Sequence, residues 1–418
     1  MKIFYALMCL SAISMMGCEP KKTSGEKTEE ELRQYADELA HRFIITDGHI
    51  DVPYRLKEQN INIGPDNANV LVSTTEGDFD FDRARKGGLD APFMSIYIPS
   101  EYQSQADMGK SLADSLINNV IAITENLPDK FALANSVEDV ENNFKAGKIS
   151  LPMGMENAAP FGNDLSNIKY FYDRGIRYAT LTHGKDNQIC DSSYDTTGTW
   201  GGLSDYGKQV VAEMNKIGIM VDISHVDDDT FYQVMEVAKA PCIASHSSCR
   251  FYTPGFERNM NDDMIKALAK NGGVIQINYG SSFLDSAVVN TNKERDARLK
   301  SLLSAEGLKE SDEAAKSIID QFNKENPKAY ATLERVVDHI DHVVAIAGVD
   351  HVGIGSDYDG VGDSLPTGLK DVSTFPNLIY ELLKRGYSEE DIEKVCSKNV
   401  FRVWSRVAEV AKELQAGS

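Results

Sequence analysis

Short apolar runs alternate with amphipathic stretches along most of the chain. Eight of the apolar runs have the length and composition of strands, and they are Phe43–Thr46, Ala91–Ile98, Ser150–Met155, Arg177–Thr182, Gly218–Ser224, Pro241–Ser245, Gly273–Tyr279 and Val352–Ser356. A regular succession of strand and helix is typical of a parallel sheet with helices packed against it. The pattern therefore predicts an α/β fold.

The stretches between these runs have the periodicity of amphipathic helices. Asp205–Lys216 and Asp262–Lys270 repeat apolar residues at three- and four-residue spacing, with acidic residues in the first turn and lysine in the last. Eight strand and helix units favour a closed (β/α)8 TIM barrel. An open dinucleotide-binding sheet is not supported, because no GxGxxG motif follows the first strand.

Two segments fall outside this repeat. Residues 281–327, rich in Lys, Glu and Asp, follow the seventh strand and are expected to form a helical insertion, either a lid or a solvated decoration. Residues 388–404 begin with the capping-box pattern Ser388-x-x-Asp391 and are expected to form closing helices.

The N-terminus predicts export. Lys2 precedes the apolar run Ile3–Leu10, which is too short to span a membrane, and Met-Met-Gly stands directly before Cys18. We interpret residues 1–17 as a lipoprotein signal peptide, Cys18 as the lipid-modified first mature residue, residues 18–36 as a polar tether and residues 37–418 as the barrel. The alternative is an ordinary secretion signal in which Cys18 has no role.

Composition narrows the class of protein. The chain has 418 residues, 42% of them hydrophobic, which is enough for one large barrel. Its net charge of -21 argues against nucleic acid and against adsorption to an anionic membrane surface. We expect an exported protein held in the cell envelope by its lipid. The later cysteines, Cys190, Cys242, Cys249 and Cys396, form no CxxC pair, and sequence alone cannot pair them.

Polar residues gather where the predicted strands end, and they are His49, Asp51, Glu156, His183, His225, His246 and Asp357. The C-terminal strand ends of a barrel form its active site, so these side chains are expected to meet in one pocket. The pair His49 and Asp51 alone is weak evidence, although residues i and i+2 of a strand share a face. His339 and His342 fall on an outer helix, His351 at the opposite end of the barrel, and His41 before the first strand.

Imidazole and carboxylate groups without cysteine suit zinc or another divalent ion. The cluster offers more ligands than one catalytic zinc needs, which points to two metals bridged by a carboxylate such as Glu156. Between two such ions, water ionises near neutral pH and becomes the nucleophile of a hydrolase. Asp357 is placed to move the proton.

Several motifs resemble the membrane (renal) dipeptidase family of the metal-dependent amidohydrolase barrels, and they are DGHIDVP, RARKGGLDAPFMSIY, LTHG, VDISHV, APCIASHSS, ERNMNDDM and HVGIGSDYDGV. The likeness runs from about Phe43 to Trp404. It implies that His49 and Asp51 bind one zinc, that His225 and His246 bind the other, and that Glu156 bridges them. It further implies that His183 binds substrate and polarises its carbonyl, that Arg258 clamps the substrate carboxylate, and that Asp357 is the catalytic acid and base. Arg250 is a weaker candidate for the clamp, and Asp359 is read as structural.

The resemblance implies a zinc dipeptidase that accepts a D-residue at the C-terminal position of its dipeptide substrate. The alternatives are a related amidohydrolase acting on N-acyl amino acids, lactams or phosphoesters, and a non-catalytic lipoprotein that captures peptides or metals. A carboxylate clamp at Arg258 favours amino-acid-like substrates. The chain lacks cysteines matching the disulfides of vertebrate members, and its anchor is N-terminal rather than C-terminal. The oligomeric state stays open, with a homodimer as the candidate.

Overall fold

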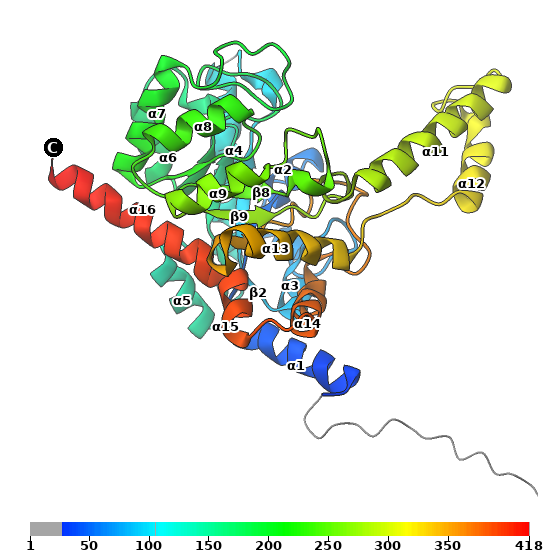
Figure 1. Ribbon diagram of the computed structural model, residues 1–418, viewed down its shortest axis with the longest axis horizontal. Coiled ribbons are helices and arrows are strands. Elements are labelled where there is room, and N and C mark those ends of the chain that lie inside the picture. The colour runs from blue at the N-terminus through cyan, green and yellow to red at the C-terminus, as the bar shows by residue number, and fades with distance from the viewer. Residues whose placement is uncertain (1–26, 105, 418) are drawn as a thin grey trace, which may run out of the picture.

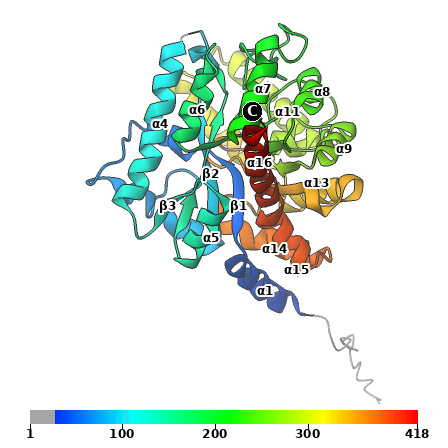
Figure 2. The ribbon, with the colours of Figure 1, turned by 90° about the vertical axis from the view of Figure 1, so that its left-hand side faces the viewer.

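Eight parallel strands stand side by side in the computed structural model, which describes residues 27–104 and 106–417. In sheet order they are β1 (Ile45–Ile50), β2 (Leu89–Tyr97), β5 (Met153–Glu156), β6 (Ile176–Thr180), β7 (Met220–Asp222), β8 (Ile243–Ser247), β9 (Val274–Ile277) and β10 (Val352–Ile354). The ring closes where the Asp51 N–H donates to the Tyr358 carbonyl (2.9 Å) and the Asp357 N–H donates to the His49 carbonyl (3.1 Å). The predicted (β/α)8 barrel is confirmed (Figures 1 and 2).

All eight barrel strands differ from the predicted ranges at one end or both, and two of these differences affect the architecture. β1 begins and ends later than predicted, so that His49 lies within the strand and Asp51 directly follows it. The single run predicted over Ser150–Met155 is divided at Pro152. Its first part, β4 (Ile149–Leu151), pairs with β3 (Phe131–Leu133) in a separate two-stranded sheet. Proline has no N–H to donate to a ladder, which explains the break.

Helices cover the outside of the barrel. They are α1 (Glu29–Arg42), α2 (Val52–Glu58), α3 (Phe81–Gly87), α4 (Ala106–Asn126), α5 (Val137–Lys145), α6 (Ser166–Asp173), α7 (Asp205–Ile217), α8 (Asp228–Val237), α9 (Asp262–Asn271), α13 (Leu333–Ala347), α14 (Phe375–Lys384), α15 (Glu389–Glu393) and α16 (Asn399–Ala416). The predicted helices appear as α7 and α9. Ser204 and Asn261 cap their first turns, and Gly218 and Gly272 end them in the left-handed conformation.

The tether predicted over residues 18–36 is wrong in its second half, because α1 begins at Glu29. Thr28 and Glu31 form a reciprocal capping box that starts the helix. Ala36 and Leu39 are then buried, and the helix packs on α14. Packing against α14 therefore orders α1, although its charged sequence predicts a solvated, unfolded tether. The predicted signal peptide and Cys18 lie outside the described residues.

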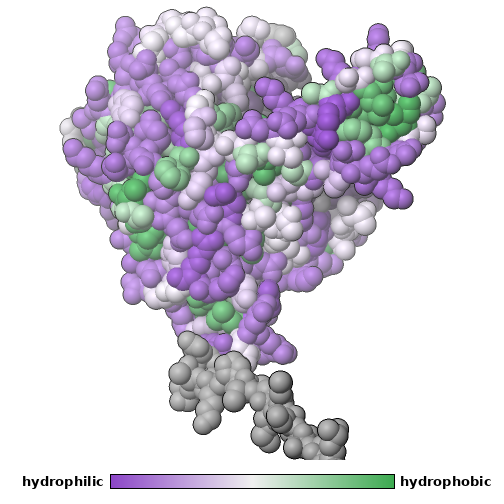
Figure 3. Space-filling view, turned by 45° about the vertical axis from the view of Figure 1, so that its right-hand side comes forward, coloured by the Kyte–Doolittle hydropathy of each residue, from purple (hydrophilic) through white to green (hydrophobic). Residues whose placement is uncertain are grey.

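The insertion after the seventh barrel strand is helical, as predicted. It comprises α10 (Ser281–Leu284), α11 (Ser286–Ala305) and α12 (Lys316–Glu325). α11 and α12 form an arm that projects from the barrel (Figure 1) and has a small core of its own around Leu299, Leu303 and Phe322. Apolar side chains are also visible on the arm surface (Figure 3). At the base of the arm, Ser282 and Phe283 line the main cavity of the barrel.

The described cysteines, Cys190, Cys242, Cys249 and Cys396, are buried free thiols. They contribute to packing rather than to cross-links. Within residues 27–104 and 106–417, no helix combines the length and the apolar character that crossing a bilayer requires.

His339 on α13 is a buried structural histidine, in agreement with the outer-helix interpretation. Its Nδ1 accepts the Cys249 N–H (3.0 Å) and its Nε2 contacts the Leu284 carbonyl (2.9 Å). Burial lowers the pKa of His339 from 6.5 to about 4. The unfolded chain therefore binds more protons than the folded one between these two pH values, and stability falls as pH drops from 6.5 to 4.

The His339→Gln variant is expected to lose this part of the pH dependence. Wild type should lose about 3 kcal/mol more unfolding free energy than the variant between pH 7 and pH 4, while the variant is the less stable protein at pH 7. Urea unfolding across this range measures the difference, with the exposed His41→Gln as control. Parallel stability curves for wild type and His339→Gln would contradict the assignment.

Candidate metal centre and active site

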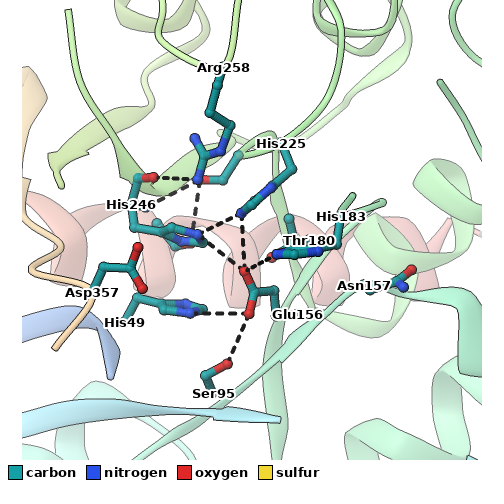
Figure 4. A network of polar contacts seen from close by, with 12 residues as sticks. His49, Ser95, Glu156, Asn157, Thr180, His183, His225, His246, Arg258 and Asp357 are labelled. Atoms are coloured by element: carbon teal, nitrogen blue, oxygen red, sulfur yellow. Dashed lines mark hydrogen bonds and ion pairs between the residues drawn. The ribbon is translucent and has the colours of Figure 1, made fainter. Parts of the chain in front are cut away.

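Glu156, the last residue of β5, lies at the centre of the polar cluster (Figure 4). Its Oε1 lies 3.1 Å from His225 Nε2 and 3.2 Å from His246 Nε2, whereas its Oε2 lies 3.4 Å from His49 Nε2. His183 Nε2 approaches Oε1 at 3.6 Å. The two carboxylate oxygens therefore face different histidines, which is the arrangement of a bridging carboxylate.

His49 and Asp51 meet as the spacing predicted. His49 Nε2 lies 3.4 Å from Asp51 Oδ2, although Asp51 has already left the strand and stands directly before α2. In each of three groups of residues, the potential ligand atoms lie within 4.8 Å of one another. The groups are His49, Glu156 and His246; Glu156, His183 and His225; and His49, Asp51 and Asp357. All seven strand-end residues therefore meet in one place, and Glu156 belongs to two of the three groups.

The backbone is strained at several of these positions. His225 and Asp357 adopt positive φ angles of 69° and 62°, and so do Asn157 (73°) and Asp359 (66°). Non-glycine residues in this region cost on the order of 1 kcal/mol or more each, and they concentrate at functional sites. His225 and Asp357 thus join the cluster from turned strand ends, whereas Asn157 donates to the Ile98 carbonyl and Asp359 pairs with Arg55.

Charge and burial shift the pKa values of the cluster. Burial alone would raise the pKa of Glu156, but the facing histidines hold it well below its usual value. Burial lowers the pKa of His225 and of His246 well below the usual value. Burial, together with the charges of Asp51 and Glu156, raises the pKa of Asp357 to about 7. Asp357 Oδ2 accepts a hydrogen bond from Asn278 Nδ2 (2.7 Å).

A cavity of about 610 Å³ opens over the cluster. Asp51, Glu156, His183, His225, His246 and Asp357 line it. Its aromatic wall, missed by the sequence reasoning, consists of Tyr54, Tyr97, Tyr194 and Phe283. Tyr97 ends β2, so the strand-end rule would have found it, whereas Tyr194 lies in a long loop with no such signal. The volume is that of a small-molecule site.

The two arginine candidates are placed differently. Arg250 forms a bidentate pair with Asp228, so its guanidinium is already engaged. Arg258 is 2% exposed, donates to the Ser247 hydroxyl (2.6 Å) and the His246 carbonyl (2.8 Å), and leaves its Nε without a partner. It is not among the cavity-lining residues, but its positive charge adds to the effect of burial in lowering the pKa of His225.

The cluster fits a metal centre. His49 Nε2, Asp51 Oδ1 and His225 Nδ1 are buried without a hydrogen-bond partner, and an unpaired buried polar atom is costly. The Nε2 atoms of His225 and His246 lie 2.9 Å apart, so two protonated nitrogens cannot face each other there. Buried imidazole and carboxylate donors without a thiolate suit zinc or a similar divalent ion.

Gly360 leaves the space that two of the carboxylates occupy. A Cβ at this position would lie 2.2 Å from Asp357 Oδ1 and 2.3 Å from Asp51 Oδ2. The Gly360→Ala variant is therefore expected to displace both carboxylates and to lower the rate of the reaction at this site by about 10²-fold, the cost of a misplacement near 1 Å. Steady-state kinetics checks this against Gly64→Ala, whose Cβ would meet nothing within 4 Å. Wild-type rates in Gly360→Ala would contradict this geometry.

Comparison with known proteins agrees with this site. The family described as membrane dipeptidase (peptidase family M19) matches residues 33–418. The chain is 34% identical over 389 residues to the dipeptidase verJ of Clonostachys rogersoniana (89% of this chain, 86% of that protein). It is 35% identical over 345 residues to the dipeptidase aclJ of Aspergillus oryzae (81% of this chain, 72% of that protein).

The solved structures include the probable dipeptidase PvdM from Pseudomonas aeruginosa. It superimposes with a TM-score of 0.77 at 28% identity, covering 91% of this chain and 100% of PvdM. The family match spans the barrel and every strand-end residue of the cluster. The chain belongs to the membrane dipeptidase family, peptidase family M19.

Proposed function

We propose that this protein hydrolyses dipeptides with a free C-terminal carboxylate, using two zinc ions held by His49, Asp51, Glu156, His225 and His246. The position of Glu156 carries the proposal, because its two oxygens face histidines from different strands. Six of the cluster's side chains line one cavity large enough for a dipeptide, which further supports a catalytic role.

Bound zinc would supply Lewis acidity and lower the pKa of a water molecule to about 7, providing a hydroxide between the ions. Arg258 would hold the substrate carboxylate by charge-assisted hydrogen bonds. His183, whose side chain is 24% exposed at the cavity wall, would donate to the carbonyl oxygen as negative charge develops there. Asp357, fixed by Asn278, would receive the proton of the attacking water and return it to the amine nitrogen as the C–N bond breaks.

The proposal includes acceptance of a D-residue at the C-terminal position, as the family resemblance implies. Matched L–L and L–D dipeptides test this directly. A kcat/KM for L–D substrates at least equal to that for L–L substrates supports it, and a strong preference for L–L removes it.

The decisive experiment uses the protein beginning after Cys18. Dipeptides, C-terminally amidated dipeptides, N-acetyl amino acids and lactams are assayed with chelator, and then with zinc restored. Zinc-dependent cleavage of free dipeptides alone supports the proposal. Cleavage of N-acetyl amino acids or lactams instead would favour the related amidohydrolase, and absence of both zinc and activity would reject the site.

We further propose that Cys18 carries the lipid and that the protein resides in the cell envelope, while the homodimer stays a candidate to be tested. The lipoprotein-like motif before Cys18 supports the first two statements. Cys18→Ala should move the protein from the membrane fraction to the soluble fraction, and intact mass should reveal the acyl groups. Light scattering of the soluble protein decides between monomer and dimer.

A further inference from the structure

A buried chain of polar groups leads from His246 into the barrel interior. Ser245 Oγ lies 2.7 Å from His246 Nδ1 and 2.6 Å from Asp222 Oδ2. Ser245 and Asp222 are fully buried, and His246 is 1% exposed. The ring nitrogen on the far side of His246, Nε2, is the one that faces Glu156.

The hydrogen bonds of Asp222 fix the direction of this chain. Its Oδ1 accepts the backbone N–H groups of Ser224 (3.0 Å) and Ser245 (2.8 Å). Its Oδ2 accepts the hydroxyls of Thr180 (2.5 Å) and Ser245 (2.6 Å). Because the Ser245 hydroxyl proton is directed to Asp222, Ser245 Oγ is left to accept a proton from His246 Nδ1. The proton of neutral His246 therefore resides on Nδ1, and Nε2 keeps its lone pair.

The other two histidines that face Glu156 most closely lack such a connection among the described residues. His49 Nδ1 contacts the Tyr178 hydroxyl (2.7 Å), and His225 Nδ1 is buried without a partner. His246 is thus the member of this trio that a hydroxyl links to a carboxylate. A partner of this kind orients a metal-binding imidazole and increases its basicity.

We propose that Ser245 and Asp222 are positioning residues that hold His246 in its Nδ1-protonated form and present Nε2 to a metal. The inference rests on the proposed function, because it assumes that the cluster binds zinc. On this proposal, Ser245 and Asp222 increase the affinity of the metal site to which His246 contributes. The loss of such a partner typically weakens metal binding by about 10–100-fold.

The test measures zinc per chain over a series of buffered free-zinc concentrations. Ser245→Ala and Asp222→Asn are expected to bind one ion about 10–100-fold more weakly than wild type while retaining the other. Ser245→Thr keeps a hydroxyl and should restore most of the affinity. Ser248→Ala is the matched control, because Ser248 is buried nearby but donates to the Asn278 carbonyl rather than contacting an imidazole.

Two further readouts separate positioning from general stability. The zinc-free variants should have a lower thermal midpoint than wild type, because each leaves buried polar groups unpaired. Adding zinc should raise the midpoint less in the variants than in wild type. A lower midpoint together with unchanged zinc affinity would overturn the proposal. In zinc-free wild type, ¹⁵N-histidine NMR should show an Nδ1-protonated imidazole that disappears in His246→Gln. An Nε2-protonated His246 would overturn the inference even if a Ser245 variant fails to fold.

The outcomes also distinguish this inference from the proposed function. A wild-type protein that binds no zinc would reject the proposed function. A wild-type protein that binds two ions, with Ser245→Ala binding both at equal affinity, would reject the positioning role alone.

Discussion

The Glu156→Gln variant is expected to lose nearly all hydrolytic activity and to bind less zinc than wild type. Glutamine keeps the size of the side chain but removes its negative charge and one of its two acceptor oxygens. One group of histidines, either His49 or the pair His225 and His246, would then face an amide N–H. We expect kcat/KM to fall by about 10³-fold or more, which corresponds to about 4 kcal/mol of transition-state stabilisation.

Zinc content and kinetics measured on the same preparation check this expectation. The exposed Glu101→Gln makes the same chemical change outside the cluster and should behave as wild type. Circular dichroism of Glu156→Gln should show an intact barrel, because the residue ends its strand rather than supporting its core. Full zinc content with wild-type kcat/KM in Glu156→Gln would refute the bridging role.

The Arg258→Met variant is expected to lose its preference for substrates with a free carboxylate. Methionine fills much of the same buried space but offers no donor. Truncation of one member of a buried charge pair costs about 2–5 kcal/mol, so kcat/KM for a dipeptide should fall by about 10²-fold or more. The same variant should change little toward the C-terminally amidated dipeptide, which has no carboxylate to hold.

The kcat/KM values of wild type and Arg258→Met, each measured on the free and the amidated dipeptide, form a double-mutant cycle between the arginine and the substrate carboxylate. A large coupling between Arg258 and the carboxylate supports the clamp, whereas equal losses on both substrates indicate a structural role through Ser247 and the His246 carbonyl. Arg250→Met is the matched control, because its guanidinium is paired with Asp228.

The barrel could be predicted from sequence because each strand and each helix carries a local pattern. Short apolar runs that alternate with amphipathic helices, and helix caps such as those of α7, can be recognised from residues close together in the sequence. Pro152 is a counterexample: its missing N–H divides one apolar run between two sheets. Similarly, α1 has a polar sequence, and its order depends on packing against α14, more than 300 residues away.

The polar residues of the candidate site could be predicted from sequence, but its aromatic wall and its supporting hydrogen bonds could not. Glu156, His225 and Asp357 were found because the end of a parallel strand is recognisable from sequence, and a barrel brings such ends together. Tyr194 and Phe283 were missed because their loops reach the cavity by paths that no local pattern records. The roles of Ser245 and Asp222 could not be predicted for another reason. The sequence does not show which neighbouring side chain a small polar residue within an apolar strand contacts.

The helix α1 packs on α14 at the outside of the barrel, and its last turn leads into β1 (Figure 2). If Cys18 is acylated as proposed, the nine residues between Cys18 and the α1 cap Thr28 give ten Cα-to-Cα steps, which span no more than about 36 Å. The anchor would then join the barrel through the outer wall formed by α1 and α14, and not through the residues that line the cavity. Such an attachment would hold the enzyme near the membrane while leaving its cavity open to small diffusing peptides.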